Sequence, residues 1–363
     1  MDYINFSGPI NSLSFGNVTI NMLRELHKLD QKTCFFPVGN NLDFDAYDKL
    51  SEDCKSWITD SYHNRLKNLN KDNSSLKMWH LMGSESTVGS RSFLYTFYEC
   101  DQPTETEVNL SSMHEKTIFS SSHSEECFKS KGLTNTEYIP IGFDEDFFET
   151  GKEYLGEKIN FGLVGKFEKR KHTAKILKLW AEKYGDNLDY QLTCCITNPF
   201  FKEDQMKLVI ASALGGKTYK NINFLSHLKT NSEMNELYNS IDINLSGLSG
   251  AEGWNLPAFN STCLGKWSIV LNATSHKDWA NKKNTILIEP EEKVKIYDGR
   301  FFNENQPFNQ GHMHRISDEC MIDAFEKAEK NNGKNNKEGV KLQKEFTYEK
   351  TLNKILEIIN NER

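Results

Sequence analysis

Residues 165–172 have the sequence GKFEKRKH and could bind a phosphorylated ligand. The apolar run over 159–164 predicts a strand that ends at a glycine, and the helical spacing of apolar residues over 173–180 predicts a helix directly after the segment. Four cations beside the positive N-terminal end of a helix are suited to a diphosphate. Taken alone, the segment is equally consistent with a solvated basic loop.

Residues 249–257, with the sequence SGAEGWNLP, offer a carboxylate in a turn. A predicted strand over 241–245 precedes this turn, and a predicted helix over 257–264 follows it. The glycines on both sides of the Ala-Glu pair allow close approach of the backbone to a ligand, and Pro257 suits the first turn of a helix. Glu252 could accept hydrogen bonds from sugar hydroxyls, although a glutamate near a helix start also stabilises the helix without any further function.

Both segments belong to a regular alternation of strands and helices in the second half of the chain. The predicted strands are 159–164, 190–196, 222–225, 241–245 and 268–271, and the helices between them are 173–180, 202–213, 232–240 and 257–264. Alternation of this kind predicts an α/β, doubly wound domain, in which helices cover both faces of a parallel sheet.

The first half of the chain is less regular but fits a second domain of the same kind. An early loop is predicted around Gly8, Pro9 and Gly16, and the predicted strands are 77–80, 117–120 and 138–144. The acidic stretch over 145–158 is the expected linker. Two doubly wound domains place a ligand cleft between the carboxyl ends of their sheets.

The composition supports two globular domains with different charges. The 363 residues are 37% hydrophobic and 26% charged, and the net charge is −7. Residues 1–150 contain 13 Lys and Arg against 23 Asp and Glu, whereas residues 151–363 contain 31 against 28. The second half therefore suits an anionic ligand, and the acidic first half disfavours nucleic acid and anionic lipid.

The sequence also bears on location and cysteine chemistry. No stretch approaches the ~20 apolar residues of a membrane span, and the chain starts without the pattern of a secretory signal, so we expect a cytoplasmic protein. Attachment to the membrane surface stays open. The eight cysteines include no CxxC pair and are expected to be reduced.

Three further features have weaker interpretations. His312 and His314 would share one face of a strand, but no nearby carboxylate or cysteine completes a metal site. Asp43 and Asp45 have the Asp-x-Asp spacing of metal-dependent sugar transferases. Chance is the better explanation for this spacing here. Glu99, at another predicted strand end, could meet an acceptor hydroxyl or be a surface glutamate.

The two segments, in this order, resemble the glycosyltransferases of family 4, which have the GT-B fold. In that family a glycine precedes a basic residue, and a lysine follows five positions later; Gly165, Lys166 and Lys171 correspond to them. The resemblance implies that Lys166 and Lys171 hold the diphosphate of a nucleotide-sugar donor.

The turn with the carboxylate resembles the family's glutamate-glycine-aromatic-glycine-leucine-proline motif. The matching residues are Glu252, Gly253, Trp254, Leu256 and Pro257. Asn255 replaces the second glycine, and Asn260 stands where the family has a second glutamate that binds the ribose. The resemblance implies that Glu252 orients the donor sugar, and Asn260 keeps hydrogen-bonding capacity but loses the charge.

The resemblance is weaker elsewhere but extends over nearly the whole chain. It implies that His80 lies near the transferred sugar and that Gly16 and Leu225 belong to the donor site. The implied domains are an acceptor-side domain over 1–150, a donor domain over 151–335 and a last helix over 336–363 that returns to the first domain.

The resulting functional hypothesis is a glycosyltransferase with retention of configuration. Its co-substrate would be a nucleotide sugar, with UDP- or GDP-sugars favoured, its acceptor an unidentified hydroxyl compound, and no metal or other cofactor is expected. Three alternatives remain open. They are a catalytically silent sugar-nucleotide or glycan-binding module, which Asn260 would favour, a nucleotide-sugar epimerase, and a virus-encoded transferase acting on modified DNA bases, which the acidic first half disfavours.

Overall fold

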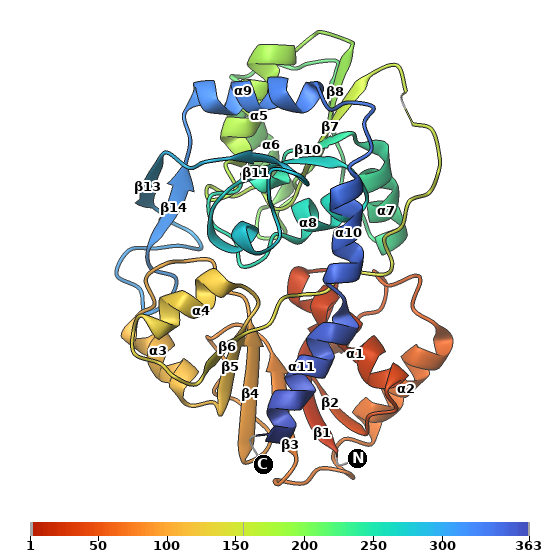
Figure 1. The fold of residues 1–363 in the computed structure, drawn as a ribbon, viewed down its shortest axis with the longest axis vertical. Helices are drawn as coiled ribbons and strands as arrows, with labels where there is room; N and C mark the ends of the chain where they lie inside the picture. The colour runs from red at the N-terminus through yellow and green to blue at the C-terminus, as the bar shows by residue number, and fades with distance from the viewer. Residues whose placement is uncertain (1–2, 155, 362–363) are drawn as a thin grey trace.

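The computed structural model describes residues 3–154 and 156–361, which form two α/β domains (Figure 1). Each domain contains a six-stranded parallel sheet, with strand order β2-β1-β3-β4-β5-β6 in the first and β12-β11-β10-β7-β8-β9 in the second. The predicted fold class, two doubly wound sheets facing each other, is therefore confirmed. No helix of the described residues is long and apolar enough to cross a membrane.

The strands are short and mostly buried, as expected for parallel sheets that helices cover on both faces. Those of the first sheet are β1 Ile4–Ile10, β2 Thr33–Leu42, β3 Ser74–Met78, β4 Arg91–Thr96, β5 Lys116–Phe119 and β6 Thr136–Tyr138. Those of the second are β7 Ile159–Val164, β8 Tyr190–Cys195, β9 Ile222–Phe224, β10 Ile243–Asn244, β11 Trp267–Leu271 and β12 Ile286–Ile288.

Helices alternate with the strands in both domains. The first domain contains α1 Ser14–Lys28, α2 Glu52–His63, α3 Glu105–Ser112 and α4 Ser122–Lys129. The second contains α5 Thr173–Tyr184, α6 Glu203–Ala213, α7 Asn231–Ser240, α8 Leu256–Cys263 and α9 Asp318–Glu329, and the chain ends with α10 Lys337–Glu345 and α11 Tyr348–Asn361. Capping residues determine where several of these helices begin; for example, Thr230 and Glu233 form a capping box at the start of α7.

The predicted early loop is wrong at Gly8 and Pro9, which lie in β1. Pairing of β1 with β2 shifts register between Gly8 and Ile10, so Pro9 sits at an irregularity, where its missing N–H does not interrupt a regular ladder. Gly8 is needed because a Cβ there would lie 2.5 Å from Oγ1 of Thr19 in α1. The strand signal over 138–144 is also too long, since β6 ends at Tyr138.

Two contacts join the domains near the places where the chain passes from one domain to the other. Helix α11 packs against α1, and Figure 1 shows α10 and α11 running from the second domain down along the first. At the other crossing, Arg24 of α1 forms ion pairs with Asp144 at 3.4 Å and Asp146 at 2.7 Å, and Asn231 of α7 donates to Asp146 at 2.8 Å. These buried groups fix how α1 and α7 face each other.

A third contact is formed by an arm, residues 292–315, which contains the antiparallel strands β13 Glu292–Lys295 and β14 His312–Arg315. Asp101 of the first domain accepts hydrogen bonds from the backbone N–H of His312 at 2.8 Å and from Lys293 at 3.0 Å. His312 therefore belongs to a domain contact, whereas the N–H of His314 donates to the carbonyl of Gly250 in the second domain at 2.8 Å. Among the described residues, no group of three or more His, Cys, Asp or Glu could hold a metal ion.

Candidate active site

A cavity of about 770 Å³ lies between the two domains. Its first-domain wall consists of Asn11, Ser12, Leu13, Ser14, Asn17, Ala46, Phe97 and Glu99. Its second-domain wall includes Gly165, Lys166, Arg170, Lys171, Phe201, His227, Lys229, Glu252, Gly253, Trp254, Asn255, Leu256 and Asn260. The structure thus brings both predicted segments to one cavity.

The basic segment between β7 and α5 presents only some of its cations to this cavity. Gly165 has a φ of +131°, in the range that favours glycine, and the chain turns there so that Lys166 and Lys171 line the cavity. Lys169 instead extends away, and its ammonium donates to the carbonyl of Tyr297 at 2.5 Å.

Lys166 is the cation best placed to receive an anion. In the part of the chain that the structure describes, its ammonium forms no ion pair or hydrogen bond, and it lies 5.5 Å from the ring centre of Phe200. Burial lowers the pKa of Lys166, and Arg170 and Lys171 lower it further against the opposite effect of Glu168. An anionic ligand would relieve this cost, so the site is suited to phosphate.

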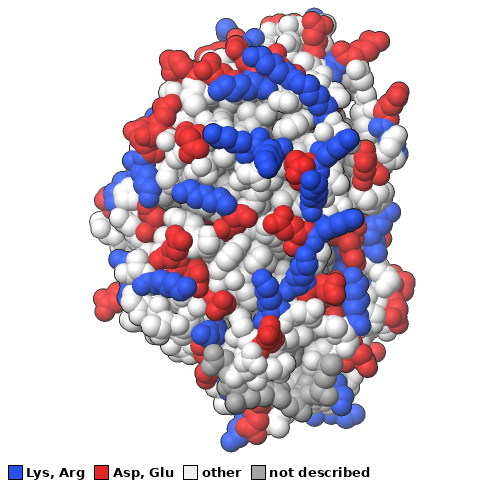
Figure 2. Space-filling model, viewed as in Figure 1, with Lys and Arg blue, Asp and Glu red and all other residues white. Residues whose placement is uncertain are grey.

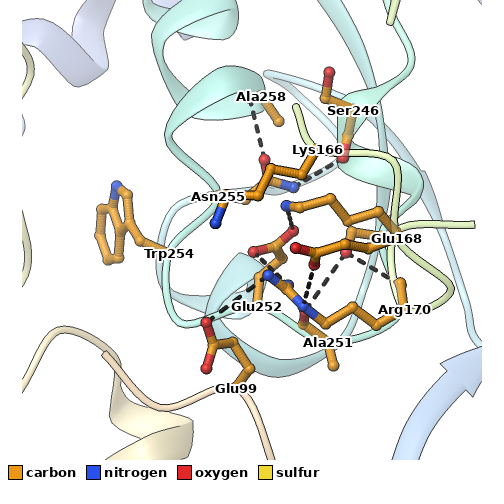
Figure 3. Close-up of polar contacts among 12 residues, drawn as sticks. Glu99, Lys166, Glu168, Arg170, Ser246, Ala251, Glu252, Trp254, Asn255 and Ala258 are labelled. Carbon is orange, nitrogen blue, oxygen red and sulfur yellow. Dashed lines mark hydrogen bonds and ion pairs between the residues drawn. The ribbon is translucent and has the colours of Figure 1, made fainter. Parts of the chain in front are cut away.

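Glu252 lies at the centre of a charged cluster (Figure 3). Its carboxylate is paired with Arg170 at 3.0 Å and with Lys171, and the residue is only 5% exposed. Burial alone would raise the pKa of Glu252, but Arg170 and Lys171 outweigh it and hold that pKa well below its usual range. The carboxylate is therefore ionised, fixed in direction and able to accept hydrogen bonds from a ligand.

The glycines that flank this carboxylate make room for protein segments. A Cβ on Gly250 would lie 2.2 Å from the carbonyl oxygen of His314 in the arm. A Cβ on Gly253 would lie 2.9 Å from Cβ of Phe97 in the first domain. The turn can therefore pack tightly between the arm and the segment that follows β4, which is a different reason for glycine from the close ligand approach inferred from the sequence.

Asn255, which replaces a family glycine, has a φ of +73°. Asparagine tolerates this left-handed conformation better than most residues, so the replacement preserves the turn. Its side chain also forms bonds that glycine cannot: Nδ2 donates to the carbonyl of Ser246 at 2.9 Å and lies 2.9 Å from Nε2 of His276, and Oδ1 accepts from the N–H of Ala258. Since Nδ1 of His276 lies 2.8 Å from the carbonyl of Leu271, Nε2 is the acceptor for Asn255.

These bonds predict an order of stability at position 255. Asn255→Gly keeps the left-handed turn but loses the cap and the bond to His276, which should lower the free energy of unfolding by about 1 kcal/mol. Asn255→Ala loses the same bonds and adds roughly 1 kcal/mol of left-handed strain. Urea unfolding should therefore rank wild type above Asn255→Gly and Asn255→Gly above Asn255→Ala. An alanine variant as stable as the glycine variant would contradict this account.

Asn260 is buried in α8 and lines the cavity, and its Oδ1 has no hydrogen-bond partner among the residues described. Trp254 also lines the cavity, but Figure 3 shows its ring turned away from Glu252, and it packs against Phe259 and Phe346. An unpaired buried acceptor such as Oδ1 of Asn260 is expected to meet a ligand donor.

The structure does not bring three predicted residues to the cavity lining. Gly16 is buried in α1, where a Cβ would lie 2.1 Å from the carbonyl oxygen of Asn11, so it is needed for packing. Leu225 packs against an apolar cluster that includes the lining residues Val164 and Tyr238, but Leu225 itself does not line the cavity. Part of His80 is exposed, but its ring packs against Phe15, with 4.2 Å between the ring centres. Phe15 in turn packs against the lining residue Phe97, so the ring of His80 lies near the cavity although it does not line it. Loss of hydration lowers the pKa of His80, Glu99 raises it and Lys166 lowers it.

Sequence reasoning missed other parts of the site. Arg170 was only one of four cations in a loop, yet its guanidinium lies 2.9 Å from Glu168 and 3.0 Å from Glu252, which makes it part of the cluster around Glu252. Near Gly16 the sequence indicated a loop at the donor site but not a helix start: α1 begins at Ser14, and both Ser14 and Asn17 line the cavity, so the positive end of this helix borders it. No sequence signal distinguishes Arg170 from Lys169, because only the backbone path decides which side chain turns inward.

Comparison with known proteins places the architecture in a class. No family model and no curated protein matches the chain. Among solved structures, HepE of Anabaena in complex with UDP and glucose is similar with a TM-score of 0.66 and 13% identity, over 99% of this chain and 100% of that one. Sucrose-phosphate synthase of Thermosynechococcus elongatus has a TM-score of 0.71 and 10% identity, over 99% of both chains.

Trehalose 6-phosphate synthase of Burkholderia multivorans is also similar, with a TM-score of 0.65 and 10% identity over 99% of this chain and 96% of that one. These proteins share the arrangement of two facing doubly wound domains. The chain therefore has the GT-B fold, as predicted.

Proposed function

We propose that the protein is a glycosyltransferase that moves a sugar from a nucleotide-diphosphate donor to a hydroxyl acceptor. The observation that carries this proposal is the unpaired ammonium of Lys166 beside the Lys171, Arg170 and Glu252 cluster, in a cavity between two GT-B domains. Lys166 and the start of α1 provide positive charge for a diphosphate, and Glu252 provides a fixed acceptor for sugar hydroxyls.

The solved structures support a nucleotide-sugar donor. HepE has been crystallised with UDP, with UDP and glucose, and with UDP-glucose. A uridine diphosphate sugar is accordingly the first donor to test, and a guanosine diphosphate sugar the second. Oδ1 of Asn260 is positioned to accept a hydrogen bond from a ligand hydroxyl such as one of the ribose.

The proposed reaction retains configuration, as the family resemblance implies. The bond between the anomeric carbon and the diphosphate breaks, the acceptor oxygen bonds to that carbon on the same face, and the acceptor proton passes to a donor phosphate oxygen. Lys166 and Lys171 stabilise the charge that develops on the leaving diphosphate. Glu252 is held between two cations, which suits it to orienting the sugar rather than to attacking it.

A DNA-glycosylating enzyme is not favoured. Figure 2 shows Lys and Arg interspersed with Asp and Glu over the face it presents, without a large area of one sign. Nucleic-acid binding usually needs a continuous basic surface. Strongly salt-dependent binding of duplex DNA would restore this alternative.

The test is a titration of the full chain with UDP, GDP, ADP and CMP and with their common sugar conjugates, followed by thermal unfolding. We expect one nucleotide to raise the unfolding midpoint, because a ligand that binds only the folded state adds about 2.7 kcal/mol at 100 times its Kd. No response to any nucleotide at millimolar concentration would contradict the proposal.

Product analysis separates the remaining alternatives. A transferase should slowly release free sugar and nucleotide from its donor when no acceptor is present. A silent binding module would release neither, and an epimerase would change the sugar while it stays attached to the nucleotide. NMR of the incubated donor distinguishes these outcomes.

A further inference from the structure

We infer that the acceptor is an uncharged polyhydroxylated compound, such as a neutral glycan, rather than a phosphorylated one. This inference rests on the proposed function and concerns the first-domain wall of the same cavity. Among the described residues of that wall, Glu99 is the only one with a formal charge, and the wall contains no lysine or arginine. Every lysine and arginine found in the cavity lining belongs to the second domain.

Glu99 lies in the loop after β4, three residues beyond its last residue Thr96, and extends toward the charged cluster, as Figure 3 shows. Its carboxylate lies 3.8 Å from the guanidinium of Arg170, across the boundary between the domains. Glu99 is partly exposed, and it lines the cavity on the side where an acceptor would approach Glu252. A carboxylate at this place accepts hydrogen bonds from hydroxyls and repels a phosphate.

The cations of the cluster do not offset this repulsion. Arg170 already contacts three carboxylates, those of Glu168, Glu252 and Glu99, and Lys171 is paired with Glu252. Lys166 and the exposed Lys229 are the lining lysines without a carboxylate partner among the described residues, and the donor diphosphate would use Lys166. A second phosphate, on the acceptor, would therefore find no free counterion in the cluster beside Glu99.

The remainder of the first-domain wall suits neutral hydroxyl compounds. Asn11, Ser12, Ser14 and Asn17 offer uncharged hydrogen-bonding groups near the start of α1. Phe97 adds an apolar surface next to Glu99 on the same wall. Side chains of these kinds match the alternating polar and apolar faces of a saccharide.

The experiment compares binding of neutral saccharides and their phosphorylated counterparts by the full chain in the presence of UDP, on a glycan array that carries both. For the wild type we expect at least tenfold stronger retention of the neutral member of a pair. Glu99→Lys should narrow this ratio at least fivefold by improving retention of phosphorylated saccharides, and Glu99→Gln should narrow it less. Glu105→Lys is the matched control, because it makes the same charge change on an exposed residue of the first domain outside the cavity lining.

Three results would overturn the inference: preferred retention of phosphorylated saccharides by the wild type, an unchanged ratio in Glu99→Lys, or retention of no saccharide at all. Failure of the proposed function is distinguishable, because the nucleotide titration would then show no response. A protein that binds UDP and prefers phosphorylated saccharides would keep the proposed function and reject only the neutral acceptor.

Discussion

Lys166→Ala is expected to lower sugar transfer about 100-fold, equivalent to about 2.7 kcal/mol of activation free energy. Lys166 borders the cavity without a carboxylate partner in the described structure, so its charge is available to the leaving diphosphate. This charge acts where negative charge increases during bond cleavage, so kcat should fall as well as donor affinity. Donor consumption and product formation, measured at saturating and limiting donor, would separate the two effects.

Lys169→Ala is the matched control for this prediction. The two lysines lie three positions apart in one loop, but Lys169 donates to the carbonyl of Tyr297 and does not line the cavity. The control should keep nearly wild-type transfer. Equal losses in both variants would mean that the loop contributes only general positive charge, and no loss in Lys166→Ala would reject its role in the reaction.

Much of the second domain could be predicted from the sequence because its strands are short apolar runs separated by helical patterns. Residues 159–164 were predicted as a strand, and β7 has these bounds. The first domain was harder: β1 contains Gly8 and Pro9, which indicate a loop in isolation. Only the packing of Gly8 against Thr19 and the irregular pairing at Pro9 explain these residues, and both are tertiary contacts.

For the site, too, the sequence predicted local features but not those that depend on tertiary contacts. The turn that holds Glu252 could be found from its residue types, but the direction of each side chain could not. Gly16 shows the limit clearly, because it lies next to a cavity-lining loop yet faces the carbonyl of Asn11. The role of Asn255 was equally hidden, since its partners Ser246 and His276 come from other parts of the chain.

Glu252→Gln is expected to lower the free energy of unfolding by about 3 kcal/mol at pH 7, the usual scale for breaking a buried ion pair. The substitution leaves Arg170 and Lys171 without the carboxylate that both now contact. Because the pKa of Glu252 is held below its usual value, its stabilising contribution is fully present above about pH 4.3, the value for an unfolded chain. The contribution is lost as the pH falls further, through the folded-state pKa.

The pH dependence separates this electrostatic account from a simple packing defect. Urea unfolding of wild type and Glu252→Gln should differ by a constant amount between pH 5 and pH 8. The difference should shrink below about pH 4, because the unfolded wild-type chain gains a proton on Glu252 at a higher pH than the folded protein does. Glu203→Gln is the control, because Glu203 also lines the cavity but is exposed and paired with the exposed Lys207. If the difference in the free energy of unfolding persists unchanged at low pH, Glu252 stabilises the turn by packing. Its charge would then act on the ligand and not on stability.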